Sequence, residues 1–282
     1  MMGGGMGGRS KYGSPNPKVE EELKRPRRGI LLRLGKYLWQ MKWFLLLALG
    51  ATMGIFLSGD LYTTFIFFEM MSFASYVWVV QEETPEAISA SRSYLTIGVL
   101  GGLVTLMGVF LLYHLAGTLQ LDALRDACAA VENRRLLYAA GGCILFGFAA
   151  KAGMFPLHFW MPRSYTAAPA PATAILSAVL SKAGIFGVLI VSCDMFYRDA
   201  DWGMLILMLG VVTMLLGAVL GLFSVNLKRT LACSSMSQIG FILVGVGMQG
   251  LLGAHNQLAV YGTVLHMINH SLIKLILFVI AG

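Results

Sequence analysis

The sequence predicts an all-α polytopic membrane protein, and three observations support this prediction. Hydrophobic residues make up 57% of the 282 residues and charged residues only 12%, whereas charged residues are roughly a quarter of an ordinary soluble domain. The mean hydropathy is +0.73. The apolar residues gather into runs of about 20 residues, which is the length of a helix that crosses a bilayer. These features exclude a soluble globular domain.

The first 36 residues differ from the rest of the chain. They begin with MMGGGMGGRSKYGSPNPK and show no apolar period, a composition typical of disordered segments. We therefore expect a basic, disordered cytoplasmic tail over 1–36 and a transmembrane domain over 37–282. The segment 19–38, which overlaps the end of this tail, is expected to form a short amphipathic helix on the membrane surface.

About eight membrane-spanning helices are expected after the tail, because eight apolar runs are separated by short polar connections. The tripeptide SGD at 58–60 predicts a tight turn. The longest connection, 116–135, contains DALRDACAAVENRR and is expected to hold a short surface helix. The expected spans are 37–58, 60–80, 91–115, 136–154, 172–196, 203–224, 231–250 and 258–281.

The distribution of basic residues predicts the orientation in the membrane. Ten of the 21 Lys and Arg residues lie within 1–42, and basic flanks of a first span stay on the cytoplasmic side. With eight spans, both termini then face the cytoplasm. We expect a multi-pass protein of the cell inner or plasma membrane, without a cleaved signal. The basic tail fits contact with the lipid bilayer and does not indicate nucleic-acid binding.

Four cysteines, Cys128, Cys143, Cys193 and Cys233, show neither a CxxC pair nor a His/Cys spacing typical of a metal site. We interpret them as small packing residues. The sequence contains no cofactor or nucleotide motif, so we expect no cofactor, no metal site and no catalytic chemistry on this chain.

Ionisable residues inside the apolar runs are the candidate functional residues. A charged lysine at the centre of a bilayer costs about 2.5–3.5 kcal/mol on insertion scales, so such residues are interpreted first as functional sites. Desolvation favours the neutral form of a lysine, which suits a group that takes up and releases protons. The candidate proton-pathway residues are Glu69, Lys151, Lys182, His266, His270 and Lys274. The last three are spaced four apart and share one helical face.

Each of these residues also has a structural explanation. Glu69 would pair with a lysine only to fix the register of two helices. Lys274 lies nearer a helix end, from which its side chain would reach the interface. His266 and His270 would bind a metal, but no third ligand is evident, so a proton-relay or hydrogen-bonding role is favoured.

The segment between Lys151 and Lys182 predicts a broken helix. Prolines beside an apolar run interrupt the backbone hydrogen bonding of a helix. At membrane depth such breaks persist only where they line a cavity or pack inside protein. The residues expected to support the break are Pro156, His158, Pro169 and Pro171. For His158, a structural hydrogen bond is as well supported as a role in transport.

Six motifs carry a resemblance to a known family. They are GDLYTTFIFFEMMSFASYVWVV, EETPEAISASRSYLTIGVLGG, AAKAGMFPLHFWMP, APAPATAILSAVLSKAG, LKRTLACSSMSQIGFILVG and LHMINHSLIKLILFVIAG. Together they cover most of residues 59–282. The chain resembles the antiporter-like membrane subunits shared by respiratory complex I, Mrp-type multisubunit cation/proton antiporters and membrane-bound energy-converting hydrogenases.

The resemblance implies a fold and a set of roles. Two inverted five-helix repeats are implied, of which this chain would supply one half and most of a second. Glu69 matches the family's intramembrane glutamate, and Lys151 matches the lysine with which it pairs. Lys182 matches the lysine of the first broken helix, the central proton carrier. His266 and His270 fall in the region that links the two half-channels.

The implied function is proton translocation as a membrane subunit of a redox-driven proton pump or a multisubunit cation/proton antiporter. This chain would serve a translocating oxidoreductase of the NADH:quinone or hydrogenase type. Its implied partners are other membrane subunits, among them a second antiporter-like chain, and its implied cargo is the proton. Sodium handling is kept as an alternative cargo.

A second alternative is a truncated, non-pumping structural or assembly subunit. Counterparts of the family's first three helices and of its C-terminal helices are not found in the sequence. A fragment, a split-gene product or a short paralogue completed by another polypeptide would each explain this difference.

Overall fold

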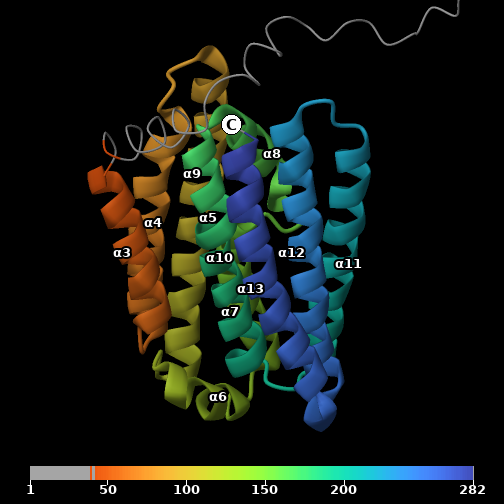
Figure 1. The fold of residues 1–282 in the computed structure, drawn as a ribbon. Coiled ribbons are helices and arrows are strands. Elements are labelled where there is room, and N and C mark those ends of the chain that lie inside the picture. The colour runs from red at the N-terminus through yellow and green to blue at the C-terminus, as the bar shows by residue number, and fades with distance from the viewer. Residues whose placement is uncertain (1–38, 40–41, 282) are drawn as a thin grey trace, which may run out of the picture. The chain divides into compact units, whose positions relative to one another are not determined.

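The computed structural model describes residue 39 and residues 42–281. The expected tail over 1–36 and the expected amphipathic helix over 19–38 lie outside these residues. Among the described residues, seven helical segments are long and apolar enough to cross a membrane, and the shorter α3 (Lys42–Leu57) is also apolar. Figure 1 shows these segments running side by side. The all-helical membrane fold is therefore confirmed.

The helical elements follow the expected spans closely. Short helices or turns join or interrupt the long segments. After α3, the elements are α4 (Leu61–Val80), α5 (Pro85–Ala116), α6 (Leu121–Ala129), α7 (Arg134–Ala152), η1 (Leu157–Phe159), α8 (Trp160–Ala167), α9 (Ala170–Ile175), η2 (Leu176–Leu180), α10 (Ser181–Ile190), η3 (Val191–Met195), α11 (Ala200–Leu222), α12 (Leu227–Leu251), η4 (Gly253–His255) and α13 (Gln257–Ile280).

The two predicted connections are confirmed. The turn at 58–60 leads into α4, whose first turn is capped by Asp60: the Thr63 N–H donates to Asp60 Oδ1 at 2.8 Å. The predicted surface helix in 116–135 is α6. Leu61 N donates to Leu119 O, and Leu121 N donates to Gly59 O, each at 2.9 Å. These two bonds tie the α3–α4 turn to the start of α6.

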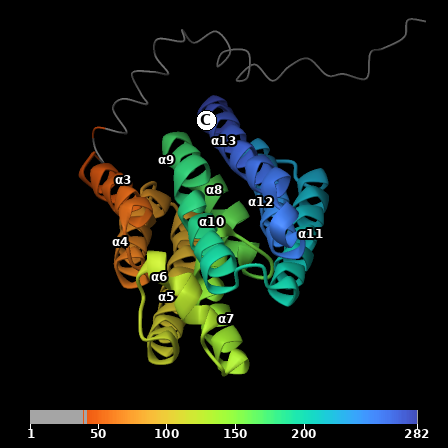
Figure 2. The same cartoon turned by 90° about the horizontal axis from the view of Figure 1, so that it is seen from below.

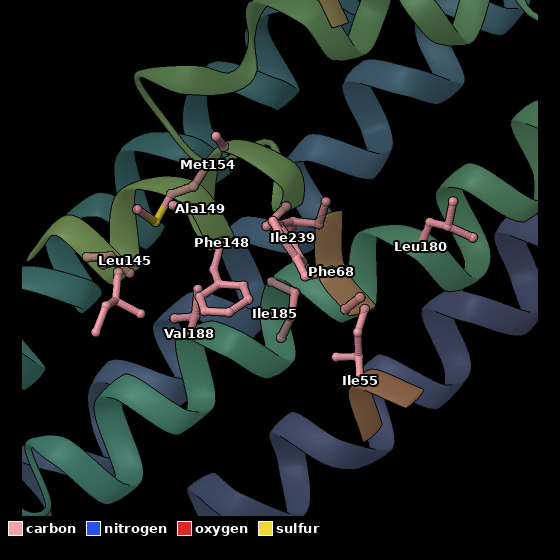
Figure 3. Packing of buried hydrophobic residues seen from close by; sticks show 14 of the residues in the cluster. Ile55, Phe68, Leu145, Phe148, Ala149, Met154, Leu180, Ile185, Val188 and Ile239 are labelled. Carbon is pink, nitrogen blue, oxygen red and sulfur yellow. The ribbon is translucent and has the colours of Figure 1, made fainter. Parts of the chain in front are cut away.

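The segment that carries Lys182 lies at the centre of the helix bundle formed by residues 42–281. Figure 2 shows α9 and α10 between α3 and α4 on one side and α11, α12 and α13 on the other. Figure 3 shows the ring of Phe148, on α7, near Val188 and Ile185 of α10. Phe148 also meets Phe68 of α4 edge-on, with ring centroids 4.8 Å apart. Central helices therefore have apolar neighbours on several sides, and a polar group on them is removed from lipid.

Glycines allow the backbones of α11 and α12 to approach closely. A Cβ atom on Gly240 would lie 2.6 Å from Met214 Cα and 2.7 Å from Gly210 O, which are backbone atoms of α11. A Cβ on Gly217 would lie 2.5 Å from the Ser237 nitrogen of α12. Small residues at a helix–helix contact are the usual means of such packing in membranes.

The predicted broken helix is confirmed, and the structure locates the interruptions. The helix α7 ends at Gly153 with φ +79°, and the Phe155–Pro156 peptide bond that follows is cis. A second break separates α8 from α9, where Pro169 is the N-cap and Pro171 stands in the first turn. A third irregularity, the π-helical turn η2, lies one turn further on and was not predicted from the prolines.

Asp199, between η3 and α11, anchors the end of the helix bundle that carries α6. Its carboxylate accepts hydrogen bonds from the Tyr138 hydroxyl at 2.7 Å, from Arg134 Nη2 at 2.7 Å and from the Trp202 N–H at 3.0 Å. Burial acts to raise the pKa of Asp199, but the bonds from Tyr138 and Trp202 and the positive Arg134 outweigh it and hold the pKa below its ordinary value of 3.8.

Asp199→Asn is expected to lower the thermal stability of the solubilised protein at neutral pH. Asparagine still caps a helix, so the change isolates the loss of charge. Because the pKa of the folded state is lowered, the carboxylate contributes stability above the unfolded pKa, and this contribution is lost as pH falls through the folded pKa. The difference in melting temperature between native protein and variant should therefore shrink below about pH 3.8. A difference that stays constant down to more acidic pH would contradict this role of the charge.

Candidate functional site

Glu69 lies on the face of α4 that meets α5. Its carboxylate fits against Gly102 of α5, where a Cβ atom would lie 2.5 Å from Glu69 Oε1. Oε1 is buried and has no hydrogen-bond partner among the described residues, and the same is true of Ser72 Oγ one turn further along α4. Buried polar atoms are nearly always hydrogen-bonded, to protein or to water. These two atoms therefore mark a place where water or a proton donor is needed.

Lys151 stands in the last turn of α7 and is only 7% exposed. Its Nζ donates hydrogen bonds to the Tyr94 hydroxyl and, at 3.4 Å, to Ser75 Oγ. Ser75 Oγ and the Tyr94 hydroxyl are themselves 2.6 Å apart, and Nζ lies 4.5 Å from the centroid of the Tyr94 ring. The structure thus surrounds the buried amine with two hydroxyls and an aromatic face.

The direct pairing of Glu69 with Lys151, expected from the resemblance, is not formed in this structure. The Tyr94 and Ser75 hydroxyls take the hydrogen bonds of the lysine instead. Two cavities of about 10 Å³ each lie along the way. One is lined by Glu69 and the other by Lys151, and both are lined by Ser72, Tyr94 and Gly98. A volume of about 10–15 Å³ holds one water molecule, so each cavity has space for about one water, one beside Glu69 and one beside Lys151.

Glu69 also reaches the outer side of α4. A larger groove of about 510 Å³ lies between α3 and α4, and Glu69 is the ionisable residue in its otherwise apolar lining, with Phe44, Leu47, Phe65 and Met70 among the others. The carboxylate therefore stands between this groove and the inner cavities.

Lys182 begins the regular helix after η2 and is 6% exposed. Its Nζ donates to Ser177 O at 2.8 Å and lies 3.0 Å from His270 Nδ1. The Ser177 carbonyl also accepts from Ser181 Oγ at 2.8 Å. Single π-helical turns within α-helices are frequent at functional sites. Here the irregular turn supplies an acceptor for a buried amine.

The face of α13 predicted from the sequence is confirmed as a polar face that turns inward near Lys182. His270 and Lys274 are buried, and the rings of His266 and His270 lie nearly parallel with centroids 6.4 Å apart. Lys274 is 2% exposed and its Nζ donates to Leu231 O of α12 at 3.0 Å. The alternative that Lys274 reaches the interface is therefore wrong, because α12 covers it and supplies a carbonyl.

Four basic side chains form a cluster at this face of α13: Lys182, His266, His270 and Lys274. The Nε2 atoms of both histidines are buried and have no hydrogen-bond partner in the described part of the chain. Like charges close together in a medium of low dielectric disfavour one another.

The two remaining predicted residues, His158 and Pro156, lie in or beside η1. His158 lies in η1 and its ring stacks on Phe155 with centroids 6.0 Å apart. Its Nδ1 is buried without a partner among the described residues, so the structural hydrogen bond offered as one explanation is not formed. Pro156 stands at the N-terminal side of η1, and the Phe155 N–H before it donates to Thr213 Oγ1 of α11 at 3.0 Å.

Sequence reasoning missed Tyr94, Ser75 and Ser177. A tyrosine and serines inside apolar runs carry no charge, so their presence alone did not distinguish them from packing residues. Their role is visible only in the structure, where α4, α5 and η2 place them in hydrogen-bond contact with Lys151 or Lys182.

Comparisons with known proteins agree with this architecture. The sequence profile described as "NADH:quinone oxidoreductase/Mrp antiporter, TM" matches residues 58–282. The chain is 34% identical over 248 residues to an Na⁺/H⁺ antiporter subunit of Alkalihalophilus pseudofirmus, covering 88% of this chain and 49% of that protein. It is 32% identical over 257 residues to hydrogenase-4 component B of Escherichia coli, covering 88% of this chain and 38% of that protein.

A solved structure shows the same fold. A chain of the Mrp complex from Dietzia sp. DQ12-45-1b superposes with a TM-score of 0.76 at 28% identity, over 83% of this chain and 43% of that chain. The chain spans half or less of the length of these relatives. A match over most of its residues shows its family all the same: this chain belongs to the NADH:quinone oxidoreductase/Mrp antiporter transmembrane family.

Proposed function

We propose that this chain translocates protons as an antiporter-like membrane subunit of a redox-driven pump or a multisubunit cation/proton antiporter. The observation that carries the proposal is the contact of Lys182 with His270, 3.0 Å apart in the core of the helix bundle. Lysine and histidine side chains both accept protons, so this contact places two buried proton acceptors next to each other. The relatives named as Na⁺/H⁺ antiporter and hydrogenase subunits support the same function.

The proposed mechanism is a relay. A proton arrives at Lys182 and passes through the contact with His270 to His266, whose Nε2 is buried without a partner among the described residues. The charge of Glu69 and Lys151 controls whether Lys182 holds the proton, because charges in a low-dielectric interior act over several ångströms. The hydrogen bonds of Lys151 to hydroxyls of α4 and α5 keep it apart from Glu69 in the present arrangement. Movement of Lys151 towards Glu69 would change the field at Lys182.

The proposed setting is a complex of several membrane subunits, with both chain termini on the cytoplasmic side. The relatives include subunits of Mrp antiporters and a component of a hydrogenase, and the basic residues of 1–42 support the orientation. Electron transfer, where it drives the pump, would take place on partner subunits. Protons are the preferred cargo, because lysines and histidines around Lys182 repel a sodium ion, which binds to oxygen ligands.

Glu69→Gln tests the function. The change removes the charge but keeps the size of the side chain, so we expect proton flux per assembled complex to fall at least about tenfold. The complex is purified through a tag on this chain, reconstituted in liposomes and driven by its electron donor or by a cation gradient, with a pH-sensitive dye inside. Glu132→Gln, at an exposed position before α7, is the matched control and should keep native flux.

The same experiment separates the structural alternative. Loss of flux at native subunit stoichiometry supports translocation. Unchanged flux together with poor assembly would instead assign Glu69 to helix register and this chain to an assembly role.

A further inference from the structure

The hydrogen bonds of the buried lysines Lys151 and Lys182 go to different elements. Lys151 is bonded to side chains of α4 and α5, whereas Lys182 is bonded to η2 and contacts α13. If a proton passes from one site to the other, some group between them must accept it and release it. The helix α8, which stands between α7 and α9 in the chain, carries two hydroxyls that are buried without a partner among the described residues, those of Ser164 and Tyr165. Tyr165 is the one whose ring packs against both Trp160 and Phe278 of α13.

Tyr165 is buried, with 0% of its surface exposed, and its hydroxyl has no hydrogen-bond partner among the described residues. Burying a hydroxyl without a partner costs about 1–3 kcal/mol by protein mutational data. A tyrosine placed only for packing would be replaced at no such cost by phenylalanine. The hydroxyl therefore calls for an explanation other than packing.

The neighbours of Tyr165 belong to both sites. The Tyr165 ring and the ring of Tyr94, whose hydroxyl holds Lys151, both pack edge-on against Trp160. On the other side, Thr173 of α9 donates to the Tyr165 carbonyl, and α9 leads directly into η2, which carries Ser177. Ser181 Oγ and Lys182 Nζ are each 2.8 Å from the same acceptor, Ser177 O. Tyr165 is thus placed between the partner of one lysine and the neighbours of the other.

Aromatic contacts hold the Tyr165 ring in this position. The Trp160 ring meets Tyr165 edge-on at 6.0 Å between centroids, and Phe278 of α13 meets it at 5.6 Å. Trp160 also packs on Tyr94 at 5.0 Å. The Tyr165 backbone carbonyl accepts from Thr173 Oγ1 of α9 at 3.2 Å. The ring is fixed on several sides, while the hydroxyl stays free to rotate its proton towards either site.

We propose that the Tyr165 hydroxyl is the group through which protons pass between the Lys151 site and the Lys182 site. The proposal rests on the proposed function of proton translocation. In each passage the Tyr165 oxygen accepts a proton from the Tyr94 side and releases its own proton towards Ser181 and Lys182. One O–H bond forms as another breaks, and the tyrosine is neutral before and after the transfer. Passage in the opposite direction follows the same steps in reverse.

Tyr165→Phe is the test, because it removes only the hydroxyl and keeps the ring contacts with Trp160 and Phe278. Positioned proton-transfer groups contribute about 10²–10⁴-fold, so we expect flux per assembled complex in proteoliposomes to fall at least about tenfold, with native subunit stoichiometry and a thermal stability equal to or above that of the native protein. The residual flux should show a larger decrease in D₂O than native flux does. Tyr138→Phe is the matched control: it removes a hydroxyl bonded to Asp199 and should keep native flux while lowering stability.

A second variant keeps the proposal open to refutation if Tyr165→Phe assembles poorly. Ser177→Ala combined with Ser181→Ala removes the hydroxyls on the Lys182 side and is expected to lower flux in the same way. Native flux in Tyr165→Phe, or in the assembled serine variant where Tyr165→Phe does not assemble, would overturn the proposed link. If Glu69→Gln loses flux and Tyr165→Phe does not, the link is wrong and the translocation function stands. If Glu69→Gln also keeps native flux, the proposed function itself is wrong.

Discussion

Lys182→Met is expected to abolish proton translocation while the complex assembles normally. Methionine is close to lysine in volume and is apolar, so it fills the same buried site without leaving a cavity. It also removes the cost of desolvating an amine at bilayer depth. What is lost is the proton acceptor that contacts His270 at 3.0 Å. Because a positioned proton-transfer group contributes about 10²–10⁴-fold, flux per complex should fall by about that factor.

The matched control is Lys228→Met, since Lys228 also donates to a backbone carbonyl, that of Ala168 at 3.3 Å, but lies in the first turn of α12. Both variants are compared in proteoliposomes by dye-reported pH change, with subunit stoichiometry measured on the same preparation. Proton flux in Lys182→Met equal to that of Lys228→Met would refute the relay.

Gly240→Ala is expected to give the largest loss of stability from the smallest change in side chain. The added Cβ would lie 2.6 Å from Met214 Cα and 2.7 Å from Gly210 O. These are backbone atoms, so no side-chain rotation relieves the clash and the two helices α11 and α12 must separate. Overpacking of this kind costs about 1–3 kcal/mol. A lower melting temperature of the detergent-solubilised complex is the expected readout.

Gly262→Ala provides the control within a neighbouring membrane helix. A Cβ atom at this position of α13 meets no atom within 4 Å, and alanine is favoured over glycine in a helix by about 1 kcal/mol. Its melting temperature should equal or exceed that of the native protein. Equal melting temperatures for Gly240→Ala and Gly262→Ala would show that the α11–α12 contact is more compliant than its geometry indicates.

Most of the secondary structure was predictable, because the bilayer imposes one length and one kind of element on the chain. The spans, the turn at Asp60 and the surface helix α6 follow from apolar runs and from polar connections, which are local properties. The breaks at Gly153–Pro156 and at Pro169 follow from proline and glycine chemistry. The turn η2 was not predictable in this way, because LSAVL contains no residue that forbids an α-helix.

Ionisable side chains are costly to place in an apolar helix, and the same contrast with their surroundings makes the candidate residues recognisable in the sequence. An ionisable group in an apolar run stands out without any structure, so all six candidate residues, from Glu69 to Lys274, could be named from the sequence, and their place in a proton pathway stays a prediction. Their partners were not. Tyr94 and Tyr165 are neutral and amphipathic, and both belong as well in a packed membrane helix as in a proton path.

The sequence by itself determined that the chain crosses a membrane many times and which ionisable side chains it places at membrane depth, because hydropathy and charge are written residue by residue. Only the tertiary structure decided which groups meet. In the structure, Lys151 donates a hydrogen bond to Tyr94 and not to Glu69. Lys182 contacts His270, which is 88 residues away in the sequence, and Lys274 donates to a carbonyl of α12. These contacts depend on how distant helices approach one another, and that approach is set by the fit of whole surfaces.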